Sequence, residues 1–213
     1  MPSTIYLLRH AESHHNVTKD FSLRDPGLTS LGTAQSAALG STFPALDTVS
    51  ILLASPLTRT IETTLAAFGP LLNVDAQDGA GPKARLILDP HLQERSALPC
   101  DTGSPVEALK VRFPQLEGVI GEGVPEGKWF AKEGIFAEDD ESVKARAKKV
   151  RERLAGLVKE LESGGGARKD VVVVTHGVFM KFLAEDEEVD LPRPGYKAYR
   201  AEGEGEGVKL VPV

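Results

Sequence analysis

Five residues scattered along this sequence have the side chains that phosphoryl chemistry requires. They are Arg9, His10, Arg59, Glu94 and His176. Two guanidinium groups and two imidazoles would make a small, strongly anion-attracting pocket, because planar guanidinium forks match phosphate oxygens well. A neutral imidazole can attack phosphorus and form a phosphohistidine, which divides one difficult displacement into two easier ones. Nearby positive charge disfavours protonation of that imidazole and so keeps it nucleophilic near neutral pH.

The other requirements are charge stabilisation and a proton. Most of the rate enhancement would come from positive groups that stabilise the charge on the phosphoryl group during its transfer. The leaving alkoxide needs a proton, and Glu94 is the best placed carboxyl group to supply it. Taken alone, the Arg9–His10 pair is equally well explained as a surface loop with two adjacent basic residues. Whether the pair belongs to an active site depends on the secondary structure that positions it and the other candidate residues.

Each candidate residue closely follows a predicted β-strand. The four predicted strands are Ile5–Leu8, Val49–Ala54, Ala84–Leu88 and Val171–Val174. These runs have the length of strands, and both their odd and their even positions are apolar. This pattern is typical of parallel strands that are buried on both faces of a sheet. In open parallel sheets, ligands bind just beyond the carboxyl ends of the strands. Four catalytic-type groups at equivalent strand ends are a much stronger signal than any one of them.

Helical patterns separate the predicted strands. We expect helices in LTSLGTAQSAALGSTF, in LTRTIETTLAAF, at Glu141–Ser163 and after Thr175-His176-Gly177. The first has Thr29 or Ser30 as a candidate N-cap and an apolar stripe of Leu31, Ala34, Ala38 and Leu39. The second follows Ser55-Pro56, where proline suits a helix start, and is expected to stop at Gly69-Pro70. The third has apolar residues three and four apart opposite a charged face.

The remaining segments predict loops and one cap. Residues 73–83 indicate a polar surface connection, and residues 201–207 a flexible loop or hairpin turn before a last short strand at Val208–Val211. Residues 96–140 are rich in Pro, Gly and aromatic residues with weak periodicity, which indicates an irregular cap beside the site. Because there is no internal repeat and no long linker, we expect residues 1–213 to form a single domain.

Composition narrows the function classes. The chain has 213 residues, 41% of them hydrophobic, which is ample material for a core. A net charge of −6 argues against broad nucleic-acid or membrane-surface binding. The single cysteine, Cys100, rules out an internal disulfide and suits a reducing compartment. With no signal-like N-terminus and no apolar run near the roughly 18 residues of a membrane span, a cytoplasmic or nuclear protein is expected.

Five stretches together resemble one family. They are LLRHAESHHN, LTSLGTAQ, ASPLTRTIET, LQER and VVVTHGVF, and they occur in the order found in the histidine phosphatase superfamily, also called phosphoglycerate mutase-like. The matches span both ends of the chain and leave only residues 96–140 unmatched. The resemblance implies an α/β fold, a three-layer α/β/α sandwich with a mostly parallel central sheet, one non-parallel edge strand and catalysis without a metal or other cofactor.

The resemblance also implies residue roles. His10 would be the nucleophile, with Arg9, Arg59 and His176 holding the phosphate, Asn16 as a further phosphate contact and Glu94 as the proton donor. The sequence departs from the family pattern in two places. Ala11 stands where glycine usually follows the nucleophilic histidine, which adds one methyl group to that loop. Ser96-Ala97-Leu98-Pro99 replaces the aromatic residue and glycine of the mutases, which favours a phosphatase. Glu12 after Ala11 excludes the acid phosphatase and phytase signature.

Several other motifs invite sharper interpretations. Cys100 as a phosphatase nucleophile would need an arginine six residues later, where Val106 stands. Asp101-Thr-Gly-Ser104 spells an aspartic protease signature, but such sites need two paired carboxylates, so a turn or substrate-side loop is the better account. His14 and His15 are expected at the pocket rim, because no carboxylate or cysteine frame accompanies them for a metal. Lys128, Trp129 and Phe130 would either touch substrate or pack the cap.

We therefore expect a metal-independent phosphomonoesterase acting on a small phosphorylated substrate through a phosphohistidine on His10. The enzymatic alternative is a phosphoglycerate mutase. The alternative from another class is a catalytically silent module that binds phosphate esters and serves in interactions. The cap should set specificity, through Asp101, Glu107, Lys110, Arg112 and Lys128. Sugar phosphates, nucleotides, phosphopeptides and secondary-metabolite phosphates all remain open as substrates.

Overall fold

The structure, a computed structural model, describes residues 2–72 and 83–213. The connection expected at 73–83 lies outside these residues except for Lys83. The described residues form six β-strands and seven α-helices joined by short 3₁₀ turns. In chain order they are β1 (Ile5–Arg9), α1 (His14–Thr18), α2 (Ser30–Thr42), β2 (Val49–Ala54), α3 (Thr58–Leu72), β3 (Arg85–Leu88), α4 (Val106–Arg112), α5 (Glu117–Gly123), α6 (Asp140–Ser163), β4 (Asp170–Thr175), α7 (Gly177–Ala184), β5 (Gly195–Glu202) and β6 (Lys209–Pro212).

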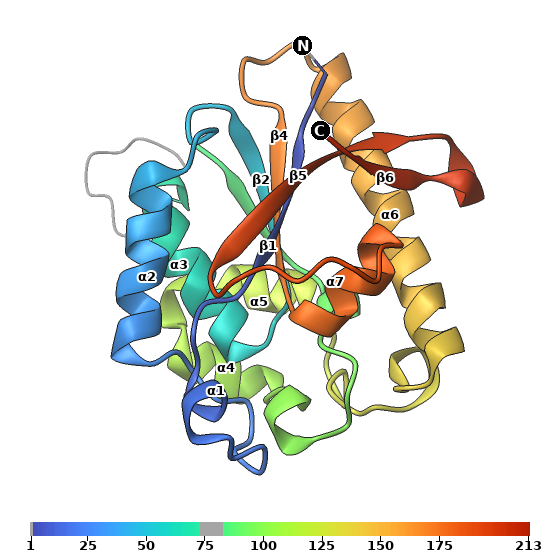
Figure 1. Cartoon of the computed structure of the whole chain (residues 1–213). Coiled ribbons are helices and arrows are strands. Elements are labelled where there is room, and N and C mark those ends of the chain that lie inside the picture. Colours follow the sequence, from blue (N-terminus) through green and yellow to red (C-terminus); the bar gives the residue numbers. More distant parts are fainter. Residues whose placement is uncertain (1, 73–82) are drawn as a thin grey trace.

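The strands form one sheet in the order β3-β2-β4-β1-β5-β6 (Figure 1). β1 to β4 pair in parallel, which confirms the four predicted strands and the mostly parallel sheet. The register aligns Arg9 with Thr175 and Ala54 with Val174. As a result, the loops that follow β1, β2 and β4 all emerge at one edge of the sheet, where the candidate residues were expected.

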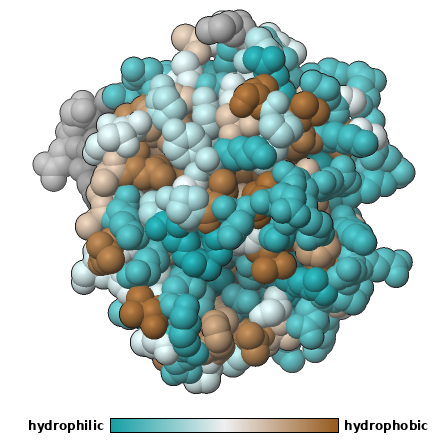
Figure 2. Space-filling view, viewed as in Figure 1, coloured by the Kyte–Doolittle hydropathy of each residue, from teal (hydrophilic) through white to brown (hydrophobic). Residues whose placement is uncertain are grey.

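Helices cover both faces of the sheet and make three layers. Leu8, Leu52 and Val172 point to one face and pack with α3 and the segment after β3. Leu7, Leu53 and Val173 alternate to the other face and pack with α6 and α7. The predicted stripe of α6 is confirmed. Because these apolar stripes pack inward, the face in Figure 2 shows hydrophobic residues only in small groups among hydrophilic ones.

The predicted apolar stripe of α2 was wrong at Leu31, Ala34 and Ala38, which are exposed, whereas Leu39 is partly buried and packs against the core. Thr29 is the N-cap as expected, but the buried side of the helix consists of Gly32, Ser36 and Gly40. A Cβ on Gly40 would lie 2.0 Å from the carbonyl oxygen of Ala67 in α3. α2 therefore packs backbone to backbone, through small residues whose hydropathy gives no helical signal.

The end of α3 and the strand β5 also differ from expectation. α3 begins two residues after Pro56 and continues through Pro70 to Leu72, since Leu71 and Leu72 are buried in the core and hold the last turn there. β5 was missed. It pairs antiparallel with β1 and connects through the expected hairpin to β6. The C-terminal run was predicted to be the non-parallel edge strand; β6 is at the edge but runs in the direction of β1, and β5 beside it is the strand that runs the other way. Its mixed exposure and charged residues hide the alternation that a strand normally shows.

The cap segment 96–140 is less irregular than expected, because it contains α4 and α5. Leu109, Phe113, Leu116 and Ile120 of this segment are buried and join the core cluster beside α3. These helices are too short for their periodicity to stand out in a sequence. The segment therefore packs onto one helical layer and also reaches the edge of the sheet where the site lies (Figure 1).

Candidate functional site

His10 lies directly after β1 at the carboxyl edge of the sheet. Its backbone N–H donates to the carbonyl of Thr175 at 3.0 Å, which fixes it beside the end of β4. Its ring Nδ1 lies 2.7 Å from the carbonyl oxygen of Ala11. Because a carbonyl only accepts, Nδ1 carries the proton, and Nε2 is the unprotonated nitrogen, whose lone pair can accept. Ala11, the residue that departs from the family pattern, is fully buried, and its N–H donates to Oγ1 of Thr63.

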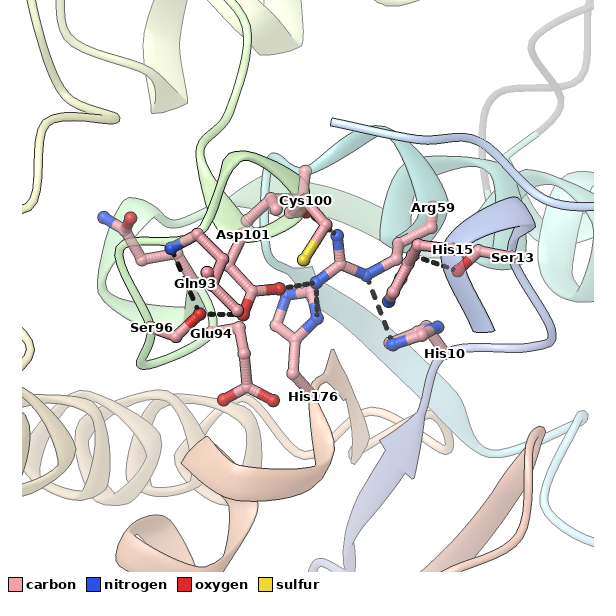
Figure 3. A network of polar contacts seen from close by, with 12 residues as sticks. His10, Ser13, His15, Arg59, Gln93, Glu94, Ser96, Cys100, Asp101 and His176 are labelled. Atoms are coloured by element: carbon pink, nitrogen blue, oxygen red, sulfur yellow. Dashed lines mark hydrogen bonds and ion pairs between the residues drawn. The ribbon is translucent and has the colours of Figure 1, made fainter. Parts of the chain in front are cut away.

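Arg59, in the first turn of α3, is the centre of the polar network (Figure 3). The side chain is only 1% exposed. Its Nε donates to Nε2 of His10 at 3.2 Å, and its Nη2 donates to Nδ1 of His176 at 3.0 Å. Its Nη1 donates to the carbonyl of Cys100 at 2.6 Å, and Nη2 also donates to Oδ1 of Asp101 at 2.8 Å. One guanidinium therefore joins both candidate histidines to the cap.

His176 follows β4 and precedes α7, and it is fully buried. Since its Nδ1 accepts from Arg59, the proton lies on Nε2, which donates to Oγ of Ser55 at 3.0 Å. The ring centroids of His10 and His176 are 5.2 Å apart. Burial and the charge of Arg59 hold the pKa of both imidazoles well below the usual histidine range. Both rings are therefore neutral near pH 7, as the sequence predicted for a nucleophile.

Arg9 and Glu94 flank this centre. The guanidinium of Arg9 lies so close to the backbone after His176 that a Cβ on Gly177 would come within 2.8 Å of it. Its Nη1 is 2.8 Å from Oδ1 of Asp190. The carboxylate of Glu94 points to the start of α7 in Figure 3 and accepts from three backbone N–H groups, those of Arg95, Val178 and Phe179. A carboxylate at a helix N-terminus is a favourable arrangement.

Asn16 is the one predicted site residue that is engaged elsewhere. It lies on α1, where its side-chain oxygen accepts from the backbone N–H and the hydroxyl of Ser13, in a capping box. Its Nδ2 lies 2.9 Å from Nε2 of His15. His15 is on the helix and buried, instead of in a rim loop as expected, and its ring centroid is 6.3 Å from that of His10. Burial and the charge of Arg59 lower the pKa of His15 to about 4.

Four further residues reach the site that the sequence did not assign to it. Ser55 follows β2 directly, so the strand-end rule that found the others would have found it as well. Asp101 appeared only as one of several cap residues. Lys132, also from the cap, donates to Oε1 of Gln93 and to the carbonyl of Glu94. The exposed Arg193 adds to the charges that lower the pKa of His10. No sequence pattern marks Lys132 or Arg193, because only the folded chain brings them close.

The sharper motif interpretations are not supported by the geometry. Burial and the neighbouring Asp101 raise the pKa of the Cys100 thiol to about 11, the opposite of an activated nucleophile. Trp129 is buried, and its Nε1 donates to the carbonyl of Ser104, so it packs the cap. Within residues 2–72 and 83–213, no three His, Cys, Asp or Glu side chains are arranged to hold a metal ion. In the same part of the chain, no helix has the length and apolarity of a membrane span.

Known proteins are similar to much of this sequence. The sequence profile of the histidine phosphatase superfamily (branch 1) matches residues 5–194. A curated relative, phosphoglycerate mutase-like protein 1 of Arabidopsis thaliana, is 26% identical over 208 residues, which cover 83% of this chain and 69% of the relative. Another, a phosphoglycerate mutase-like protein from the same plant, is 30% identical over 143 residues, and these span only about half of each chain (54% and 53%).

Among solved structures, the ecdysone phosphate phosphatase of Bombix mori in complex with tungstate superposes with a TM-score of 0.61 at 17% identity, covering 99% of this chain and 92% of that one. At this identity the likeness shows the fold. It confirms the three-layer architecture expected from the sequence.

Proposed function

Because the chain belongs to the histidine phosphatase superfamily, we propose that it hydrolyses a phosphomonoester through a covalent phosphohistidine on His10, without a metal ion. The observation that carries the proposal is the contact between Nε of Arg59 and Nε2 of His10 at 3.2 Å. It aims the one unprotonated nitrogen of His10 at the guanidinium that would hold a phosphate. The nucleophile and the phosphate-binding group therefore already share one site.

The reaction would proceed in two displacements. First, the lone pair on Nε2 of His10 attacks phosphorus, the P–N bond forms, and the ester P–O bond breaks toward the leaving oxygen, which takes up a proton from the carboxyl group of Glu94. Second, water gives a proton to the carboxylate of Glu94 as it attacks the phosphohistidine, the P–N bond breaks, and inorganic phosphate leaves while His10 regains its neutral form. The carbonyl of Ala11 keeps the ring in the tautomer that both steps require. Arg59 and Arg9 would stabilise the charge on the phosphoryl oxygens.

The remaining roles follow from position. Glu94 is proposed as the proton donor, since it lies on the loop after β3 and its carboxylate reaches the start of α7 directly after His176. In this structure the carboxylate accepts three hydrogen bonds from backbone N–H groups. His176 would contact the phosphate by donating from Nε2–H, which now donates to Oγ of Ser55. Asn16 would become a phosphate contact only by exchanging its hydrogen bonds within α1. The cytoplasmic or nuclear location expected from the sequence stays a prediction.

Phosphate release from a broad panel of phosphoesters, with a chelator present, tests the proposal. The wild-type protein should release phosphate, and His10→Ala should lower kcat by at least about 10³-fold, because no other group can form the covalent intermediate. His14→Ala is the matched control: His14 is exposed on α1, and its removal should leave turnover unchanged. Full activity in the His10→Ala protein, or loss of wild-type activity on chelation, would rule out this mechanism.

Phosphoglycerate mutase activity is the second candidate, because the two curated relatives are named for their likeness to that enzyme. The product decides between the two, since a mutase returns isomerised phosphoglycerate and a phosphatase returns free phosphate. A protein that binds phosphate esters without turning any of them over would instead be the interaction module.

A further inference from the structure

The guanidinium of Arg59, which the proposed reaction assigns to the substrate's phosphate, is already occupied. Its four hydrogen bonds engage two imidazoles, one carbonyl and one carboxylate. An arginine side chain has five N–H donors, so little of its binding capacity is left. The carboxylate, that of Asp101, is the only anion among these partners. It stands where an incoming anion would have to bind.

Asp101 is firmly held in this position. Its side chain is 11% exposed, and Oδ1 lies 2.8 Å from Nη2 of Arg59. Its other oxygen, Oδ2, accepts from the hydroxyl of Ser96 at 2.6 Å. The short 3₁₀ turn Pro99–Asp101 that carries it is fixed to the loop after α1, because the N–H of Cys100 donates to the carbonyl of Phe21. Figure 3 shows the carboxylate between Ser96 and Arg59.

A phosphate and a carboxylate cannot both pair closely with one buried guanidinium without a large electrostatic cost. Like charges at such distances repel strongly where water is excluded. Phosphate also prefers two parallel N–H donors of arginine, one of which Asp101 now uses. Other cations reach the site, Lys132 and Arg193 among them, but neither contacts Asp101 by a hydrogen bond, so Arg59 is the group the two anions would share.

We propose that Asp101 is a competing anion that occupies the phosphate-binding face of Arg59 in the free protein and must be displaced by the substrate. This inference rests on the proposed function of the site. The displacement lowers the affinity for every phosphate group equally. Free inorganic phosphate and very small esters therefore bind weakly, and only an ester whose organic part gains contacts with the cap recovers the lost free energy. Asp101 thus keeps free phosphate and the smallest esters from occupying the site and limits inhibition by the product.

Titration calorimetry with inorganic phosphate tests the assignment at a single pH of about 7. Asp101→Asn keeps the shape of the side chain and removes its charge, so the dissociation constant for phosphate should fall about tenfold. Ser96→Ala loosens Asp101 without changing its charge and should lower the constant by about twofold to threefold. Glu107→Gln is the matched control, because it removes one charge from the same cap at a residue whose salt bridge is with Lys110 on the surface.

The outcomes separate the possibilities. If Asp101 only orients Arg59, then Asp101→Asn weakens phosphate binding, and the proposal is wrong. An unchanged constant in Asp101→Asn, or an equal gain in Glu107→Gln, also overturns it. Ser96→Ala decides the matter if a thermal melt shows that Asp101→Asn does not fold. The proposed function fails by a different result, namely that the wild type turns over no ester. The phosphate titrations test the effect of Asp101 independently of that result.

Discussion

His10 shows how the surroundings of one imidazole keep its ring neutral, as the proposed nucleophilic role requires. Burial removes the water that would stabilise a charged ring, and the guanidinium of Arg59 adds a like charge beside it. The carbonyl of Ala11 then selects the tautomer whose lone pair faces Arg59. The same two causes, burial and Arg59, act on His176. Two neutral imidazoles thus line a positively charged site, which suits an anionic substrate.

The ring of His10 should therefore stay neutral at pH values where an ordinary histidine is charged. Because its pKa is lowered and the neutral form is the nucleophile, acidification through pH 6.5 should not protonate it. ¹⁵N NMR of histidine-labelled protein, with the His10→Ala spectrum for assignment, measures this directly. A His10 signal that titrates with a midpoint near 6.5 would contradict the prediction.

How much of the site could be predicted depends on the residue. His10, Arg59 and His176 follow buried strands or begin the next helix, so the strand-end rule and the family motifs both found them. Asp101 lies in a cap whose short helices give no periodic signal, and only the folded chain shows its ion pair with Arg59. The spacing of residues in the sequence predicts those site residues that regular strands and helices position. It does not predict side chains that reach the site from an irregular cap.

At the scale of elements, the same contrast separates β2 and β4 from α2. Strands buried on both faces must be apolar throughout, so their sequences reveal them. α2 packs through Gly32 and Gly40, where the absence of side chains is what the neighbouring backbone requires. Hydropathy therefore assigned the wrong side of this helix to the core.

Replacing Gly40 by Ala tests this packing. The added Cβ would lie 2.0 Å from the carbonyl oxygen of Ala67, which neither helix can accept without moving. The free energy of unfolding should fall by about 1–3 kcal/mol, as for other overpacked sites. Gly156→Ala in α6 is the control, since nothing lies within 4 Å of its Cβ, and it should raise stability by up to about 1 kcal/mol. Urea unfolding measures both, and equal effects in the two variants would refute the packing argument.

At the scale of the whole molecule, the burial of Lys132 makes the free energy of unfolding of the protein depend on pH. Burial and the charge of Arg146 lower the pKa of Lys132 to about 7, although Asp101 and Glu94 oppose the shift and Arg59 adds to it. Between pH 7 and about 10.5 the unfolded chain holds a proton on this lysine that the folded protein has lost. Below pH 7 the folded protein bears the full free-energy cost of burying the charged amine. Above pH 7 the buried amine loses its proton, so this cost falls and the protein becomes more stable.

The unfolding free energy of the wild type should accordingly rise relative to Lys132→Met between pH 7 and 9. The slope is at most about 1.4 kcal/mol per pH unit, the value for one proton. Urea titrations of both proteins at three pH values measure it, with Lys144→Met on the exposed face of α6 as the control. A difference between wild type and Lys132→Met that is constant with pH would show that the amine is not desolvated.

The sheet register also decides where the two ends of the chain emerge. β1 runs toward the site and β5 runs back antiparallel to it, so that Pro212 of β6 aligns with Tyr199 and, across β5, with Ile5. Both termini therefore lie at the edge of the sheet opposite His10 (Figure 1). An affinity tag or a label at the amino-terminal end would project away from His10. β6 runs in the same direction as β1, so an extension at the carboxyl-terminal end would continue toward the edge that carries His10. The amino-terminal end is therefore the better point of attachment for surface-bound assays of phosphate release.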